Sequence, residues 1–180
     1  MKRIMIDLET MGVTKRAAIM SIGAVAFDVE AGRIVDEWCI NVNVQDCLSC
    51  GLITDKTTEE FWSRPENAGA LASLSVGTVD LKVALSNLRG WVLRDADKED
   101  IEPWANGTSF DLAILEVAYE MVSLPIPWKF FNERDYRTVK RLYHEVPKPG
   151  FAGLKHNALD DARFQAEHLM RIFKAAALCP

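Results

Sequence analysis

The sequence has no apolar run approaching the roughly 20 residues of a membrane-spanning helix. Its first seven residues, Met1–Asp7, reach an acidic side chain before any long apolar stretch, so we expect no signal peptide. Repeats, low-complexity tracts and long linkers are also missing. We therefore expect a cytoplasmic protein, not bound to a membrane, in which residues 1–180 form a single domain.

Cysteine is scarce, which limits disulfide and zinc chemistry. Of the four cysteines, Cys47 and Cys50 form one C-x-x-C pair, whereas Cys39 and Cys179 stand apart. A structural zinc site needs two further ligands at suitable spacing, and no second Cys or His pair supplies them. Without a secretion signal, the thiols are expected to be reduced and to have only structural roles.

An overall excess of positive charge is lacking, since the net charge is −5. The charge is uneven, however: residues 129–163 contain eight Lys or Arg against five Asp or Glu, which leaves −8 for the rest. A protein that grips a long duplex normally shows a larger basic face. The distribution favours a small footprint, such as that of an enzyme that holds only the end of a strand.

Apolar residues make up 49% of the chain, enough for a substantial core. Strand patterns and helix periodicity alternate after three leading strands, of which the second and third are joined by a turn at 30–32. A short helix is expected to start at Thr57 or Thr58 and to reach Trp62. We expect strands at 2–9, 19–28, 33–44 and 101–105, and helices at 57–62, 79–94, 110–121, 137–144 and 157–176. This order predicts an α/β domain with a mixed sheet.

The first candidate site lies at the end of the first strand, in Asp7-Leu8-Glu9. Residues i and i+2 of a strand point to the same face, so both carboxylates project together while Leu8 faces the opposite layer. Adjacent carboxylates repel each other unless a cation lies between them, and hard oxygen ligands suit Mg²⁺ or Mn²⁺. The alternative is a strand that simply ends in polar residues.

Two further acidic positions start helices. Asp111 lies where the strand at 101–105 passes through a turn into a helix, which is a common place for sites in α/β proteins. In the last helix Asn157 is a good N-cap, Asp160 and Asp161 follow, and His156 stays in the preceding loop. Taken singly, each of these acids is equally explained by a favourable interaction with the helix dipole.

The combination of these motifs is much more specific than each of them. The chain resembles the DEDDh branch of the 3′→5′ exonucleases, and within it the small phage and prophage group related to exonuclease VIII. The segments that carry the resemblance are IDLET at 6–10, SIGAVAFD at 21–28, TTEEFW at 57–62, NGTSFD at 106–111, ERDYRT at 133–138 and HNALDDA at 156–162. The resemblance implies an RNase H-like fold, a mixed five-stranded sheet flanked by helices.

Carried over position by position, the resemblance implies the residues that hold metal and perform catalysis. Asp7, Glu9, Asp111 and Asp161 would hold two Mg²⁺ ions, for which Mn²⁺ would substitute, and His156 would be the general base. Asp160 precedes the liganding position and is not implied. Relatives of this small type often form dimers, so a homodimer is also possible.

Contacts to the substrate are a further set of expectations. The resemblance places Leu8, Thr10 and Met11 beside the terminal nucleotide. Residues 147–155 contain two prolines and two glycines. They predict a mobile loop that brings in His156 and places Lys148 and Lys155 near phosphates. Trp62 is expected in the core rather than stacked on a base. For Arg134 and Arg137, phosphate contacts and sheet-edge ion pairs both stay open.

The predicted function is that of a 3′→5′ exonuclease that removes 5′-mononucleotides from the 3′ end of DNA, from a single strand or a frayed end. An exoribonuclease with the same site is the main alternative, because no residue identifies itself as a reader of the 2′-hydroxyl. An inactive nucleic-acid-binding subunit is disfavoured, since all five positions are intact. The signature from His156 to Asp161 argues against an RNase H-type endonuclease.

Overall fold

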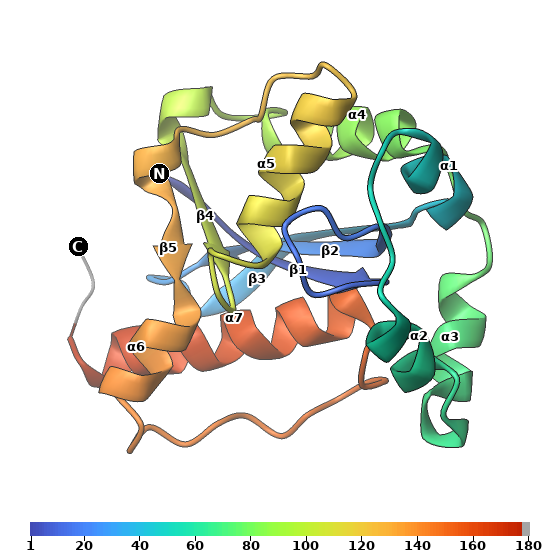
Figure 1. Ribbon diagram of the computed structural model, residues 1–180. Helices are drawn as coiled ribbons and strands as arrows, with labels where there is room; N and C mark the ends of the chain where they lie inside the picture. The colour runs from blue at the N-terminus through green and yellow to red at the C-terminus, as the bar shows by residue number, and fades with distance from the viewer. Residues whose placement is uncertain (178–180) are drawn as a thin grey trace.

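The computed structural model describes residues 1–177, which build one five-stranded sheet flanked by helices (Figure 1). The strand order is β3-β2-β1-β4-β5. β1 pairs antiparallel with β2 and parallel with β4, whereas β2–β3 is antiparallel and β4–β5 is parallel. The strands are β1 (Lys2–Thr10), β2 (Ile19–Asp28), β3 (Arg33–Asn41), β4 (Ile101–Ala105) and β5 (Arg134–Asp135). The expected mixed sheet is therefore confirmed.

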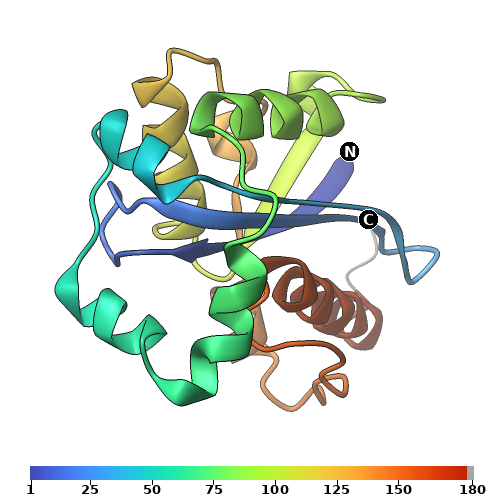
Figure 2. The same ribbon diagram turned by 90° about the vertical axis from the view of Figure 1, so that its right-hand side faces the viewer.

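The described residues contain seven α-helices, and Figure 1 shows α7 with α6 beside it on one side of the sheet, whereas α4 and α5 lie on the other side (see also Figure 2). Their bounds are α1 (Val44–Ser49), α2 (Lys56–Trp62), α3 (Ala68–Leu74), α4 (Leu81–Val92), α5 (Asp111–Met121), α6 (Tyr136–Leu142) and α7 (Ala158–Ala175). None of the helices within residues 1–177 combines the length and the apolar character that crossing a bilayer requires.

The alternation of side chains along β1 divides the core into two layers. Ile4, Ile6 and Leu8 pack with α4 and α5, whereas Met5 packs with residues of α7. Asp7 follows the same alternation, so it faces the α7 layer while Leu8 faces the opposite one, as expected. The strand thus aims its last odd-numbered side chains at the start of α7.

Two local expectations were wrong. The third strand ends at Asn41 rather than at residue 44, because Asn43 caps α1 by accepting hydrogen bonds from two backbone N–H groups. The helix that reaches Trp62 is capped by Asp55 and not by Thr57 or Thr58. An Asp55 carboxylate oxygen lies 2.8 Å from the Thr58 backbone nitrogen, and an ionised cap of this kind is stronger than a threonine hydroxyl.

The cysteines fall in ordinary surroundings. Cys47 is buried, Cys50 is half-buried and Cys39 is exposed, and all three are free. Burial raises the pKa of the Cys47 thiol to about 12, which keeps it protonated and unreactive. Cys179 lies outside the described residues.

Gly23 lets α7 approach the sheet directly opposite Asp7, its partner across the β1–β2 ladder. A Cβ atom at this position would lie 2.2 Å from the carbonyl carbon of Ala158 and 2.3 Å from the backbone nitrogen of Leu159. Real Cβ atoms do not come this close to backbone, so any side chain here would push the first turn of α7 away. That turn contains Asp161.

Replacing Gly23 with alanine is therefore expected to cost about 1–3 kcal/mol of stability and to lower hydrolytic activity about a hundredfold, as misplacing catalytic groups by about 1 Å does. Thermal unfolding and nucleotide release measure the two effects. Gly90→Ala is the control, because no atom outside its own helix lies within 4 Å of the added Cβ and alanine favours helix. Normal activity of Gly23→Ala would contradict the role of this contact.

Candidate active site

Three carboxylates converge at the C-terminal end of β1. Asp7 and Glu9 come from the strand and Asp161 comes from the first turn of α7. Each offers an oxygen, and the three oxygens lie within 4.8 Å of one another. Residues more than 150 positions apart in the chain thus form one acidic cluster of the size that a divalent cation needs.

The fourth predicted ligand, Asp111, stands beside this cluster at the start of α5. Its side chain is buried, and one carboxylate oxygen accepts a hydrogen bond of 3.2 Å from the backbone N–H of Leu8. Asp111 is not part of the group within 4.8 Å, but of all charged residues it has the largest influence on Asp7. Of the four predicted acids, three therefore form one cluster of neighbouring oxygens, and Asp111 lies next to that cluster.

The pKa values of all four carboxyl groups are raised. Burial, followed by the charges of Asp111, Glu9 and Asp161, raises the pKa of Asp7 well above its ordinary value. Burial together with Asp161 and Asp111 raises the pKa of Glu9 to about 8, and burial raises that of Asp111 to about 7 against the Leu8 hydrogen bond. Burial also raises the pKa of Asp161. Without a cation, the site cannot hold four negative charges at neutral pH.

Gln165 is a part of the site that the sequence motifs did not reveal. Its amide nitrogen donates a hydrogen bond of 2.7 Å to Asp7, while its buried carbonyl oxygen has no hydrogen-bond partner among the described residues. The opposite amide orientation would point the carbonyl at the Asp7 carboxylate. One available signal was spacing, because Gln165 lies one helical turn after Asp161 and so shares its face.

The donor set fits a hydrated divalent cation. The carboxylates supply hard oxygen ligands, and their mutual repulsion is relieved by positive charge. The orphaned Gln165 carbonyl would accept a hydrogen bond from a metal-bound water, which is how groups around a metal's direct ligands usually act.

His156 reaches the cluster from the loop before α7, as expected from its position ahead of the N-cap Asn157. Its backbone N–H donates a hydrogen bond of 3.1 Å to Asp161. The residue adopts φ +61°, a left-handed conformation that residues other than glycine adopt only uncommonly. The imidazole lies edge-on against Phe61 and Trp62, with ring centroids 5.2 and 6.0 Å away.

Asp160 organises the loop, although sequence reasoning gave it no role. Its carboxylate accepts a hydrogen bond of 2.9 Å from the Leu154 backbone N–H and pairs with Arg163 at 2.6 Å. Arg163 also binds Glu37 on β3, so the start of α7 is tied to the sheet edge. Gly153 has φ +114°, and a Cβ there would lie 2.3 Å from the Asp160 carboxylate. The loop bearing His156 is therefore anchored on both sides of the histidine.

An apolar cavity of about 330 Å³ opens beside the acidic cluster. It is lined by Leu8, Glu9, Thr10, Gly12, Val13, Thr57, Thr58, Phe61, Trp62 and Phe110. Of the three residues expected beside the nucleotide, Leu8 and Thr10 line this cavity, whereas Met11 is not among the lining residues and packs against the core. Trp62 is only 3% exposed and donates a hydrogen bond of 2.9 Å to the Thr10 carbonyl, which confirms its place in the core.

The remaining predicted contacts are distributed around the site. Arg134 is 3.6 Å from Glu102 and so belongs to the sheet-edge ion pairs. Arg137 is exposed and donates a hydrogen bond of 2.7 Å to the carbonyl of Asn106. Lys148 and Lys155 are both exposed on the loop before α7.

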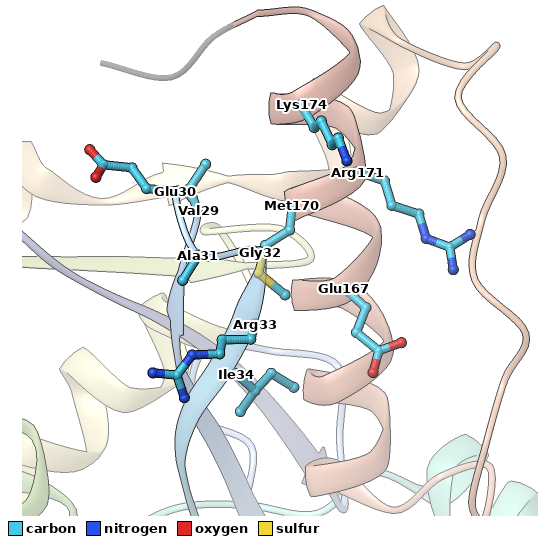
Figure 3. Close-up of a pocket in the computed structure, with 10 residues that line it drawn as sticks. All are labelled: Val29, Glu30, Ala31, Gly32, Arg33, Ile34, Glu167, Met170, Arg171 and Lys174. Carbon is cyan, nitrogen blue, oxygen red and sulfur yellow. The ribbon is translucent and has the colours of Figure 1, made fainter.

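A larger cavity, about 700 Å³, lies elsewhere, between the β2–β3 turn and the C-terminal half of α7 (Figure 3). Its lining mixes apolar side chains with opposite charges, including Arg33 and Glu167, and contains none of the acids of the cluster. Cavity size therefore does not identify the functional site here. The convergence of perturbed carboxylates does.

Comparisons with known proteins show the family and the fold of the chain. The model of a family described as the 3′-5′ exoribonuclease Rv2179c-like domain matches residues 2–173. A search among curated proteins gives no match. Among solved structures, the nuclease domain of 3′hExo, a DEDDh family member bound to rAMP, has a TM-score of 0.67 at 14% identity, covering 97% of this chain and 92% of that one.

Two further structures show the same fold. E. coli ExoI in a zinc-bound complex with ssDNA has a TM-score of 0.69 at 11% identity, over 97% of this chain and 40% of that one. Exonuclease X in complex with 5′ overhanging duplex DNA has a TM-score of 0.50 at 16% identity, over 97% and 93%. The five-stranded mixed sheet is thus the RNase H-like fold of the DEDDh exonucleases, as the motifs implied.

Proposed function

Because the chain belongs to the 3′-5′ exoribonuclease Rv2179c-like domain family and is a 3′→5′ exonuclease, we propose that it removes 5′-mononucleotides from the 3′ end of RNA with two divalent metal ions. The observation that carries this proposal is the convergence of Asp7, Glu9 and Asp161 within 4.8 Å, with Asp111 alongside. No single motif in the sequence has comparable weight.

In this proposal the four carboxylates hold the metal. Asp7 is the central ligand, because the charges of Glu9, Asp161 and Asp111 all act on its carboxylate and raise its pKa. When bound, two Mg²⁺ ions, or Mn²⁺ in their place, supply positive charge to the scissile phosphate and lower the pKa of an attacking water. The Gln165 amide fixes one oxygen of Asp7, which leaves the other free for the metal.

His156 acts as the general base. An imidazole exchanges protons near neutral pH, so its free ring nitrogen accepts the proton of the attacking water. Phe61 and Trp62 hold the ring from the side, and the hydrogen bond from its backbone N–H ties it to the ligand Asp161. The backbone of the proposed base is therefore tied directly to a proposed metal ligand.

The cavity of about 330 Å³ receives the terminal nucleotide. Its apolar walls of Leu8, Phe61 and Phe110 suit the face of a base, and contacts of this kind contribute about 1–3 kcal/mol per base. Glu9 and Thr10 line the side toward the acidic cluster. Lys148 and Lys155 stay proposed as phosphate contacts. Met11 does not line the cavity, so we do not propose it as a contact to the terminal nucleotide.

The preference for RNA is supported by the description of the family, whereas the sequence alone favoured DNA without any residue that reads the sugar. DNA remains the second candidate, because exonuclease X and E. coli ExoI are seen in complex with it. The test uses 3′-labelled and 5′-labelled single-stranded RNA and DNA of one base sequence, each with Mg²⁺, Mn²⁺ or EDTA. We expect release of mononucleotides from the 3′ end, faster from RNA, and none in EDTA.

Gln165 provides a test of the metal site that spares its direct ligands. Gln165→Leu removes the amide that orients Asp7, so the Mg²⁺ concentration for half-maximal activity is expected to rise about tenfold, within the range that such supporting groups contribute. Two variants are controls. Gln165→Asn keeps an amide at this position and should retain part of the Mg²⁺ affinity, whereas Glu167→Gln changes an exposed neighbour and should retain all of it. An unchanged Mg²⁺ requirement in Gln165→Leu would rule out the orienting role.

A further inference from the structure

A groove of about 580 Å³ beside α6 is lined by positively charged side chains. Lys140 and Arg141 come from α6, and His144 and Lys148 come from the segment that follows it. The other lining residues are Val146, Pro147 and His168, so the groove contains no acidic side chain. In a protein with a net charge of −5, this concentration of cations is local.

The lysines and the arginine of this groove have no acidic partner in the described structure, whereas His144 lies 3.6 Å from Glu145. Across residues 1–177, neither Lys140, Arg141 nor Lys148 takes part in a salt bridge, and neither does the adjacent Arg137. Partial burial, followed by the like charges of Lys148 and Arg137, lowers the pKa of Lys140 against the attraction of Asp135. Keeping like charges together in this way is unfavourable unless an anion joins them.

The groove is connected to the acidic cluster through Asn106. Lys140 donates a hydrogen bond of 2.8 Å to the side-chain oxygen of Asn106, and Arg137 donates one of 2.7 Å to its carbonyl. Asn106 follows β4, and the same turn leads into Asp111 (Figure 1). The charge of Arg137 opposes part of the rise that burial causes in the pKa of Asp111. A chain of contacts therefore runs from a predicted metal ligand to the groove.

The floor of the groove is rigidly built. The two ring nitrogens of the buried His168 lie 2.7 Å from the Tyr136 hydroxyl and 3.1 Å from the Val146 carbonyl. These contacts join α7, the start of α6 and the segment that leads to His156. Lys148 follows Val146 by two residues on that segment, so the contact between Val146 and His168 holds the backbone near Lys148.

We propose that this groove binds backbone phosphates of the nucleic-acid strand on the 5′ side of the scissile bond. The inference rests on the proposed function, which places the 3′ end in the cavity beside Phe61 and the scissile phosphate at the acidic cluster. The strand then continues past Asn106 into the groove. Regularly spaced phosphates match several unpaired cations better than a single small anion does, and an anchor of this size explains how an acidic protein holds a polyanion.

The experiment compares the double variant Lys140→Ala/Arg141→Ala with wild type on a dinucleotide and on a longer single strand that reaches the groove. We expect KM for the long strand to rise about a hundredfold, since two charge-assisted contacts are lost and each is worth about a factor of ten. Hydrolysis of the dinucleotide is expected to stay unchanged. The dependence of log KM on log salt concentration should become shallower by about 1.4 for two lost contacts.

Controls separate this role from a structural one. Arg141→Ala alone leaves the contact between Lys140 and Asn106 intact and should give a smaller shift in the same direction. Lys82→Ala removes an exposed cation on α4 and should change nothing. The charge-conserving double variant Lys140→Arg/Arg141→Lys should keep KM for the long strand close to that of wild type.

Equal effects on the dinucleotide and the long strand, or none on either, would overturn the groove while the exonuclease stands. If wild type released no nucleotides, the proposed function would fail instead. Binding of a labelled single strand to wild type and the double variant in EDTA would still report on the groove: weaker binding by the variant supports it, and equal binding overturns it.

Discussion

Replacing Asp7 with asparagine is expected to raise the melting temperature of the metal-free protein while it lowers nucleotide release about a thousandfold. The two changes have one cause. Asp7 is buried among Glu9, Asp111 and Asp161, and their charges raise its pKa well above the ordinary value. An uncharged amide of the same shape removes repulsion from the folded state, which for a domain of this size should raise the melting temperature by roughly 2–8 °C. Losing a central ligand removes several kcal/mol of transition-state stabilisation.

The measurements are thermal unfolding in EDTA and in Mg²⁺, and nucleotide release in Mg²⁺. Wild type should gain stability from Mg²⁺, whereas Asp7→Asn should gain little, because binding stabilises only what is bound. Asp97→Asn, an exposed aspartate whose side chain makes no hydrogen bond in the described structure, should leave both properties unchanged. A lower melting temperature of metal-free Asp7→Asn would show that the neighbours of the Asp7 carboxylate stabilise it, and that repulsion among the acids does not destabilise the fold.

The dependence of stability on pH tests the same repulsion at Glu9. Its pKa is raised from 4.5 to about 8 in the folded protein. Between these values the folded state binds a proton that the unfolded chain has released, so the stability that Glu9 contributes is full below 4.5 and is lost as the pH rises through about 8. Metal-free wild type should therefore melt at a lower temperature at pH 8 than at mildly acidic pH. Mg²⁺ should reduce this difference, and Asp7→Asn should make it smaller.

The sequence was most informative where a residue type and a local conformation agreed. Asp7 and Glu9 share a strand face by alternation alone, and Asn157 caps α7 through a hydrogen bond to the Asp160 backbone N–H, as its position suggested. These rules are local, so one segment suffices to apply them. The order of the motifs then implied the fold, because the same order recurs in the family.

The sequence was silent where the cause lies between distant segments. Gln165 matters because it meets Asp7, 158 positions away, and its own segment looks like any amphipathic helix. Gly23 lies in an apolar strand, and only the approach of Ala158 explains why no side chain stands there. β5 is two residues long and α1 six, too short for a periodic pattern to appear. The single-domain assignment over 1–180, the homodimer and the narrower resemblance to exonuclease VIII relatives stay predictions.

Removing the imidazole of His156 is expected to lower kcat about a thousandfold, within the range that general-base catalysis contributes. KM and the Mg²⁺ requirement should change little, because the link to the metal ligand Asp161 is made by the backbone N–H and survives any substitution that keeps the loop. The choice of substitution matters. His156 adopts φ +61°, which asparagine tolerates far better than alanine.

His156→Asn and His156→Ala therefore separate chemistry from loop geometry. If the ring accepts the proton, both variants lose kcat to a similar extent, and added imidazole restores part of the activity of His156→Ala. If the residue only holds the loop in its left-handed turn, His156→Asn retains nearly full turnover while His156→Ala loses it together with Mg²⁺ affinity, because Asp161 is then no longer held. A general base requires the first pattern. Neither variant is expected to unfold the protein, because Phe61 and Trp62, which contact the His156 ring, also pack against each other and against other residues.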